Sequence, residues 1–302
     1  MATVLVTGGT GLVGRHLCKH LKNAGYDVAI LSQVRYNKSE FPIFYWNWKD
    51  QEIDEIALKT SDFIIHLAGA NIAGQRWSKK RKELLIDSRV KSTQFLQNKL
   101  KELQLSPKAF ITASATGYYG MVTTDTVFKE SDPASTDFLG EICSQWEKAG
   151  AEVYDPRIRT AQIRTGIVLT AKDGALGKMM PPIKLGMGSP LGSGKQKMPW
   201  IHIEDLCNIY QLALENPEIY GAFNAVAPEM ETNKSLTKAI AKAVNRSIVL
   251  PNVPGFVLKI MFGEMAQILL TGSHASSQKI QDRGFKFKFP SLSGALNDLL
   301  HP

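Results

Sequence analysis

The chain has 302 residues, of which 44% are hydrophobic and 21% charged, and this composition is typical of a globular protein with a sizeable core. No run approaches the ~20 uninterrupted apolar residues of a membrane helix. The net charge of +8 accompanies no nucleic-acid-binding motif, so we expect neither a membrane nor a nucleic-acid partner. The three cysteines lie far apart, which argues against a disulfide or metal framework and for a reducing, cytoplasmic setting.

The first two-thirds of the sequence alternate between short apolar runs and longer amphipathic runs. Strands separated by helices of this length form right-handed βαβ crossovers, so the sequence predicts an α/β protein with a doubly wound, mostly parallel Rossmann sheet. In such sheets ligands bind beyond the carboxyl ends of the strands. The predicted strands cover 3–7, 28–31, 44–46, 63–67, 109–114 and 162–169, and the predicted helices cover 12–24, 53–58, 78–103 and 138–153.

The last third has a different texture. Residues 173–198 are rich in glycine, proline and lysine and predict an irregular segment. Its lysines, Lys178, Lys184 and Lys195, could meet an anionic substrate or lie on a solvated loop. Beyond it we expect a helix at 203–214, a strand at 223–226, a helix at 233–244 and a half-exposed strand at 284–289, where phenylalanine and lysine alternate.

These patterns predict two units. A Rossmann domain would cover 1–170, and the strand and helix near 200–230 would return to it. A smaller C-terminal lobe on the substrate side would comprise 171–200 and 231–302.

The most informative stretch is the glycine-rich turn that follows the first strand. An apolar run at 4–7 ends in this turn, and an amphipathic helix begins directly afterwards. Glycine admits positive φ angles and lets the backbone approach a pyrophosphate, while the helix N-terminus directs free N–H groups and a positive dipole toward it. We therefore expect a tight turn built on Gly8, Gly11 and Gly14 that binds a dinucleotide. The predicted contacts come from Gly8, Thr10, Gly11, Leu12 and Val13.

The residues after the second strand indicate which dinucleotide binds. A site for NAD places Asp or Glu there to bind the ribose 2′-hydroxyl, whereas a site for NADP omits the acid and supplies cations. Here the strand ends in Ser32, Gln33 and, two residues on, Arg35, and Asp27 lies at its other end. Ser32 can donate to a 2′-phosphate, and Arg35 or Lys38 can pair with it. The sequence favours NADP over NAD as the cofactor.

Several motifs together indicate a family. Ser-Ala-Thr-Gly-Tyr-Tyr-Gly at 114–120 and Trp-Ile-His-Ile at 200–203 are its specific ones, and the glycine motif at 7–14 defines its superfamily. On these motifs the chain resembles the extended, or atypical, short-chain dehydrogenase/reductases. More narrowly it resembles the epimerase-like family whose C-terminal segment is a domain of unknown function. The other matching motifs lie at 67–69, 88–89, 164–169, 192–194 and 204–205.

The resemblance implies further cofactor contacts. Leu67, Ala68 and Gly69 would pass the adenosine ribose and the pyrophosphate, and Thr165 to Val168 would flank the nicotinamide. Arg89 would face the cofactor, although an exposed helix arginine is an equal alternative.

The resemblance also implies a catalytic set. Ser114 ends the fifth strand, where the family's relatives keep a serine that hydrogen-bonds the reacting oxygen, and Tyr118 and Tyr119 follow closely. The superfamily's usual proton relay, Tyr-x-x-x-Lys, is missing from the helix at 138–153, where Cys143 falls near the lysine position. If the protein is an enzyme, Ser114 with Tyr118 or Tyr119 would supply the acid. The alternative is that both tyrosines only pack over the cofactor.

Two functional interpretations follow from the sequence. The favoured one is an NADP(H)-dependent oxidoreductase or epimerase-like enzyme that acts on an unidentified small carbonyl or sugar-like substrate. The alternative is a dinucleotide-binding protein that regulates a partner or senses redox state without turnover. The sequence leaves the oligomeric state open.

Overall fold

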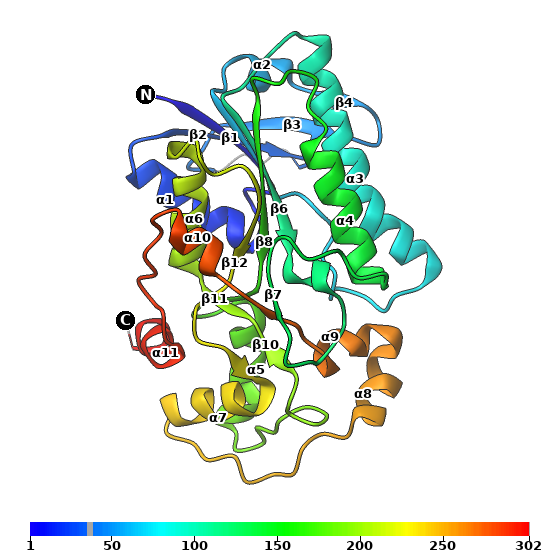
Figure 1. Ribbon diagram of the computed structural model, residues 1–302, viewed down its shortest axis with the longest axis vertical. Coiled ribbons are helices and arrows are strands. Elements are labelled where there is room, and N and C mark those ends of the chain that lie inside the picture. Colours follow the sequence, from blue (N-terminus) through cyan, green and yellow to red (C-terminus); the bar gives the residue numbers. More distant parts are fainter. Residues whose placement is uncertain (35–38, 302) are drawn as a thin grey trace.

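The computed structural model describes residues 1–34 and 39–301, and its centre is an eight-stranded sheet in the order β12-β8-β6-β5-β1-β2-β3-β4 (Figure 1). All neighbouring strands are parallel except β3 and β4, which are antiparallel. The strand order reverses at β1, because β2, β3 and β4 lie on one side of it and the later strands β5, β6, β8 and β12 lie on the other. The strands are β1 (Thr3–Thr7), β2 (Asp27–Ser32), β3 (Ile43–Asn47), β4 (Glu52–Ile53), β5 (Phe63–His66), β6 (Ala109–Ala115), β8 (Arg159–Thr165) and β12 (Gly221–Ala225).

Helices cover both faces of this sheet, because side chains along each buried strand alternate between two apolar clusters. Val4 and Val6 of β1 pack in one cluster with residues of α1 (Leu12–Asn23) and α6 (Ile203–Glu215). Leu5 packs on the other face with residues of α3 (Lys79–Glu102), beside which lies α4 (Phe138–Ala151). Figure 1 shows the two helix layers on opposite sides of the sheet. The doubly wound Rossmann fold predicted from the sequence is confirmed.

A second group of elements lies beyond the carboxyl ends of the strands. Its apolar cluster joins Leu176 and Ile183 to residues of four segments further along the chain. None of the helices in the described ranges is long and apolar enough to cross a membrane. The division of the chain into two units stays a prediction. The elements of this group are β9 (Ile167–Leu169), α5 (Gly174–Lys184), β10 (Lys197–Met198), β11 (Trp200–His202), β13 (Glu231–Thr232), α7 (Asn233–Ala243), α8 (Gly255–Phe262), η2 (Gly263–Ala266), α9 (Gln267–Leu270) and α11 (Leu292–Leu300).

The structure corrects three expectations in this region. The segment at 173–198 is not irregular throughout, because α5 and β10 lie within it and α5 buries Leu176 and Ile183. The stretch at 284–289 is not a strand: the Asp205 carboxylate accepts the backbone N–H groups of Lys288 (2.8 Å) and Phe289 (3.0 Å). The predicted strand at 162–169 is divided in two, since the chain leaves the sheet at Gly166 and β9 pairs with β11.

Smaller elements complete the fold. Ile53, which the sequence placed in a helix, lies in β4 and pairs with Trp46 of β3. Helix α2 (Glu55–Lys59) begins two residues later. The remaining elements are η1 (Thr116–Tyr119), β7 (Val127–Phe128), β14 (His274–Ala275) and α10 (Gln278–Asp282).

Candidate functional site

The turn between β1 and α1 is as tight as the sequence predicts. Gly8 has φ +69°, and its carbonyl accepts the N–H of Gly11 at 2.9 Å. A Cβ on Gly8 would lie 3.0 Å from the backbone N of Ala68, and a Cβ on Gly14 would lie 2.6 Å from Cα of Gly9. Both neighbours are backbone atoms, so glycine at these positions is what brings the turn, the end of β5 and the start of α1 together.

The N-terminus of α1 is left open toward this turn. Its N-cap is Gly11, which offers no side-chain acceptor, and the first turn of the helix contains no acidic residue. By contrast, the N-cap of α4, Asp137, accepts the N–H groups of Leu139 and Gly140 at 3.0 Å each. The orphan N–H groups and positive dipole end of α1 therefore suit an anionic ligand such as a diphosphate.

The end of β5 is held to the turn by a buried histidine. Thr7 donates its hydroxyl to Nδ1 of His66 (2.6 Å) and accepts the N–H of Ala68 (3.1 Å). Burial lowers the pKa of His66 to about 3, so the ring is neutral, and its Nε2–H donates to Ser92 at 3.2 Å. His66 therefore fixes the path of Leu67, Ala68 and Gly69 beside the glycine turn.

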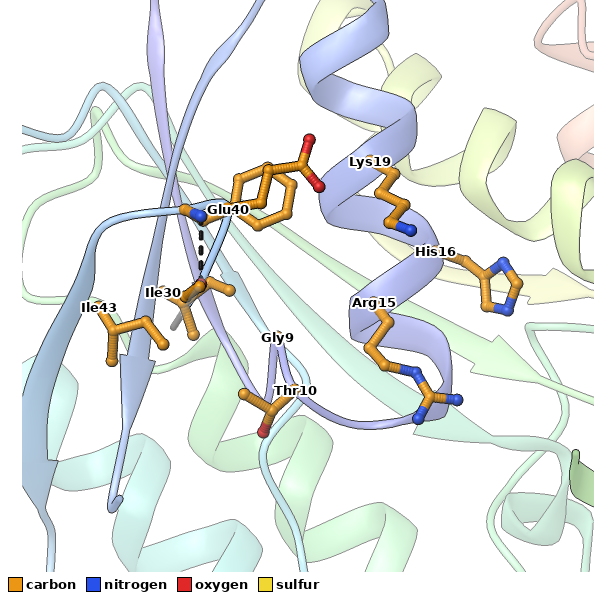
Figure 2. A pocket seen from close by; sticks show the side chains of 10 residues that line it. Gly9, Thr10, Arg15, His16, Lys19, Ile30, Glu40 and Ile43 are labelled. Atoms are coloured by element: carbon orange, nitrogen blue, oxygen red, sulfur yellow. Dashed lines mark hydrogen bonds between the residues drawn. The ribbon is translucent and has the colours of Figure 1, made fainter. Parts of the chain in front are cut away.

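A cavity of about 340 Å³ opens next to this turn (Figure 2). Figure 2 shows Arg15 and Lys19 projecting from α1 on one side, while Glu40 lies on the other. Arg15 also pairs with Asp173 at 2.8 Å, and both side chains are more than half exposed. The sequence analysis missed Arg15 and Lys19, although their positions directly after Gly14 and one turn later were a usable signal. The cavity is lined by Gly9, Thr10, Arg15, His16, Lys19, Ile30, Ser39, Glu40, Phe41 and Ile43.

The predicted phosphate-binding residues lie at the end of β2. Ser32 is buried, and its hydroxyl accepts the N–H of Val34 at 3.1 Å. Gln33 is exposed, and neither side chain lines the cavity of Figure 2. Arg35 and Lys38 lie outside the described residues.

A second cavity, of about 290 Å³, lies beyond the carboxyl ends of β6 and β8. Besides the strand ends at 115–121 and 165–167, five parts of the chain enclose it: the loop after β5, Arg89 of α3, residues 139–146 of α4, the segment around β10, and residues 268–273 near the C-terminus. Its walls are mostly apolar. The lining residues are Ile72, Arg89, Ala115, Thr116, Gly117, Gly120, Met121, Leu139, Ile142, Cys143, Trp146, Thr165, Gly166, Ile167, Lys197, Met198, Pro199, Ile268, Thr271, Gly272 and Ser273.

Thr165 and Arg89 line this cavity, whereas Val168 packs against the core cluster that includes Val4 and Val6. Arg89 donates to the carbonyl of Leu85 at 2.9 Å, and its guanidinium lies 5.1 Å from the ring centre of Trp146. No ion pair involves Arg89 within the described part of the chain. Burial lowers the pKa of its guanidinium. A cation without a carboxylate partner at a cavity wall suits an anionic or dipolar ligand.

Two of the three predicted catalytic residues, Ser114 and Tyr119, belong to a polar network beside this cavity. Ser114 donates to Oε1 of Glu147 at 2.6 Å, and Glu147 accepts two bonds of 2.8 Å from Arg164. Tyr119 donates to Asn224 at 2.7 Å and accepts from Arg164 at 3.0 Å, and burial raises the pKa of Tyr119 to about 12.

Tyr118 lies next to this network rather than within it. Its ring centre is 3.4 Å from the Arg164 guanidinium carbon. None of Ser114, Tyr118 and Tyr119 is among the described residues that line the cavity, and their catalytic roles stay predictions.

Leu139 and Cys143 face the cavity from α4, where the relay of the wider superfamily would lie. Burial raises the pKa of the Cys143 thiol to about 12, so it is protonated near neutral pH. Lys178, Lys184 and Lys195 are exposed and do not line either cavity. Lys197 lines the second cavity instead, a position that the sequence analysis did not single out.

A glycine turn that leads into an open helix N-terminus, at the strand where sheet order reverses, is the arrangement of dinucleotide-binding Rossmann proteins. Residues 4–139 match the NAD dependent epimerase/dehydratase family, and residues 253–299 match a domain of unknown function (DUF1731). Over 296 residues the chain is 36% identical to the epimerase family protein Mb2239 of Mycobacterium bovis, covering 98% of this chain and 96% of that protein. The chain belongs to this family of epimerase-like proteins.

Solved structures agree with this assignment. A crystal structure of the human epimerase family protein SDR39U1 (isoform 2) with NADPH is 31% identical, covers 98% of both chains and has a TM-score of 0.89. UDP-N-acetylglucosamine 4-epimerase from Bacillus cereus has a TM-score of 0.78 at 18% identity, covering 99% of this chain and 98% of that one, and shares the fold.

Proposed function

We propose that this protein binds NADP(H) along the carboxyl edge of the sheet and acts as an oxidoreductase or epimerase-like enzyme on a small carbonyl substrate. The observation that carries the proposal is one continuous edge: the open N-terminus of α1 lies at the end of β1, and the second cavity lies at the ends of β6 and β8. The NADPH in the human relative's crystal structure supports it. The nicotinamide would supply or accept hydride in the second cavity, beside Thr165.

The preference for NADP(H) rests on charge near the end of β2. Ser32, Gln33 and Arg35 would bind the 2′-phosphate, and no carboxylate follows β2 before Glu40. Arg15 and Lys19 add two cations at the neighbouring cavity wall. A hydrogen bond to a charged group is worth about 1.5–3 kcal/mol, which corresponds to roughly ten- to hundred-fold in affinity.

Calorimetric titration with NADPH and NADH tests this preference. We expect Arg35→Glu and Arg15→Gln to weaken NADPH binding about ten-fold or more and to leave NADH binding nearly unchanged. Lys59→Gln, on the distant and exposed helix α2, is the matched control and should bind both dinucleotides like the wild type. Equal loss of NADPH and NADH affinity in the two arginine variants would contradict the assignment.

For proton transfer we propose Ser114 with Tyr118 or Tyr119. With no Tyr-x-x-x-Lys lysine on α4 to lower the pKa of a tyrosine, oxidation of an alcohol substrate, in which the tyrosine acts as base, should be slow at neutral pH and rise in alkaline buffer. The burial that raises the pKa of Tyr119 to about 12 supports the same direction. If Tyr118→Phe and Tyr119→Phe both keep wild-type turnover, the tyrosine assignment is wrong.

One observation favours the alternative of a non-catalytic dinucleotide sensor. The hydroxyls of Ser114 and Tyr119 are already bonded to Glu147, Arg164 and Asn224. Stopped-flow absorbance of protein-bound NADPH against a panel of small ketones and aldehydes separates the two functions. Oxidation of the bound NADPH supports the enzyme, whereas tight binding with no oxidation by any compound supports the sensor.

The three free, buried cysteines support a reducing, cytoplasmic setting for either function.

A further inference from the structure

The charges that line the second cavity are all positive. Arg89 and Lys197 carry them, and no Asp or Glu of the described ranges belongs to its lining. We propose that the substrate is a small oxo acid, or the matching hydroxy acid, whose carboxylate binds the ammonium group of Lys197. This inference rests on the proposed function and narrows its substrate class.

Lys197 is held at the cavity by the C-terminal segment. It lies in β10, paired with Thr232, and the backbone of Gly272 packs directly on it. A Cβ on Gly272 would overlap the carbonyl oxygen of Lys197, so only glycine allows this close approach. Gly272 is anchored in turn by its N–H, which donates to the carbonyl of Val122 at 3.1 Å. The C-terminal domain of unknown function thus contributes a cavity wall next to this lysine.

The present partner of Lys197 is weak enough to be replaced. Its ammonium lies 3.2 Å from Oδ1 of Asp125, whose side chain is fully exposed, while the Lys197 side chain is 22% exposed. Exposed ion pairs contribute little stability, because water screens them. A carboxylate inside the cavity would meet the same ammonium in a less hydrated place, where the charge-assisted bond is stronger.

Arg89 is assigned to the cofactor and not to the substrate. A Cβ on Gly69 would lie 3.2 Å from the Arg89 guanidinium carbon, so this cation lies against the loop that we place along the dinucleotide. Lys197 belongs to β10 on the side of the C-terminal segment. One cation is thereby left for the substrate.

The other walls limit the rest of the substrate. Ile72, Met121, Leu139, Ile142 and Ile268 give the cavity apolar sides, which suit a short aliphatic or aromatic body. A sugar would bring several hydroxyls, and each buried hydroxyl without a partner is unfavourable. The cavity of about 290 Å³ must also admit the nicotinamide, so the acid is small.

Calorimetry on protein saturated with NADP⁺ tests the inference. The probes are phenylglyoxylate and 2-oxohexanoate, each compared with its own primary amide, which keeps the shape and removes the charge. We expect at least one acid to bind about ten-fold or more tightly than its amide. Lys197→Met should abolish this difference, and Lys197→Arg should keep it, which separates loss of charge from loss of folding.

Two exposed positions complete the design. Lys195→Met removes a lysine of the same segment that does not line the cavity, and it should bind the acids like the wild type. Asp125→Asn frees the ammonium of Lys197 and should strengthen acid binding several-fold. The inference is overturned by equal affinity for acids and amides, by no binding of either, or by an acid preference that survives in Lys197→Met. In each of these cases, NADP⁺ binding by the wild type leaves the proposed function standing. A wild-type protein that does not bind NADP⁺ overturns both.

Discussion

Replacing Gly14 by alanine tests how closely the first helix must approach the glycine turn. The new Cβ would lie 2.6 Å from Cα of Gly9 and would overlap the Gly8 carbonyl oxygen, whereas ordinary contacts begin at 3.4 Å. The turn and the helix must therefore separate by at least about 0.8 Å, the difference between these two distances, because the overlap with the Gly8 carbonyl oxygen is tighter still. A shift of this size lengthens a 2.9 Å hydrogen bond from the helix N-terminus to a diphosphate to about 3.7 Å, beyond bonding distance.

The expected effect is larger on binding than on stability. Each bond lost to a charged diphosphate is worth about 1.5–3 kcal/mol, so NADPH affinity should fall at least about ten-fold. Overpacking costs about 1–3 kcal/mol, and alanine's better helix propensity offsets up to ~1 kcal/mol of it. Calorimetric titration with NADPH and urea unfolding measure the two effects.

Gly25→Ala is the matched control for this variant. Gly25 ends the turn after α1 with φ +90°, and a Cβ there would meet nothing within 4 Å. Alanine at this position adds backbone strain of about 1 kcal/mol or more but does not contact the glycine turn between β1 and α1. It should therefore lower the free energy of unfolding and leave NADPH affinity intact. Binding by Gly14→Ala within two-fold of the wild type would refute the close-approach argument.

Two further predictions concern stability. Glu147→Gln leaves Arg164 buried without its counter-charge, so urea unfolding should show a loss of about 3 kcal/mol in the free energy of unfolding. The control Glu141→Gln, exposed on the same helix, should lose under about 1 kcal/mol. Equal losses would contradict a stabilising ion pair between Glu147 and Arg164. Burial raises the pKa of the three thiols from 9.0 to about 12, so the folded state keeps protons that the unfolded state releases. Their contribution to stability is complete below pH 9 and is lost as the pH rises toward 12, at about 1–2 kcal/mol per thiol by pH 10. The urea concentration at the unfolding midpoint should be lower at pH 10 than at pH 8, and an unchanged midpoint would refute this. The thiols are Cys18, Cys143 and Cys207.

The elements that the sequence predicted correctly are those in which local pattern and tertiary packing agree. Val4, Leu5 and Val6 form a fully apolar run because both faces of β1 are covered, and the glycine turn after it is fixed by requirements within a few residues. Such signals are local, so periodicity and residue type were enough.

The incorrect predictions have long-range causes. The alternation at 284–289 does bury Phe285 and Phe289, but the N–H groups that a strand would pair are bound by Asp205, more than eighty residues earlier. The glycines and prolines of 174–184 suggested a loop, yet packing against α7 keeps a helix there. Local propensity is a weak prior where tertiary contacts decide.

The site was only partly predictable for the same reason. The glycine turn and Thr165 follow from motifs, whereas the second cavity is assembled from segments that lie far apart in the sequence. Ser114 was correctly placed at the end of a strand, but its hydroxyl bonds Glu147 because Arg164 holds that carboxylate beside it. Lys197 showed no motif, since only the packing of Gly272 brings it to the cavity wall.

A crystal structure of the protein with NADPH tests the central claim most directly. The account predicts the diphosphate on the N–H groups at the start of α1, the 2′-phosphate near Ser32, Gln33 and Arg35, and the nicotinamide in the second cavity beside Thr165. A dinucleotide that lies with its nicotinamide outside this cavity, or with its diphosphate away from Gly11, would contradict the account.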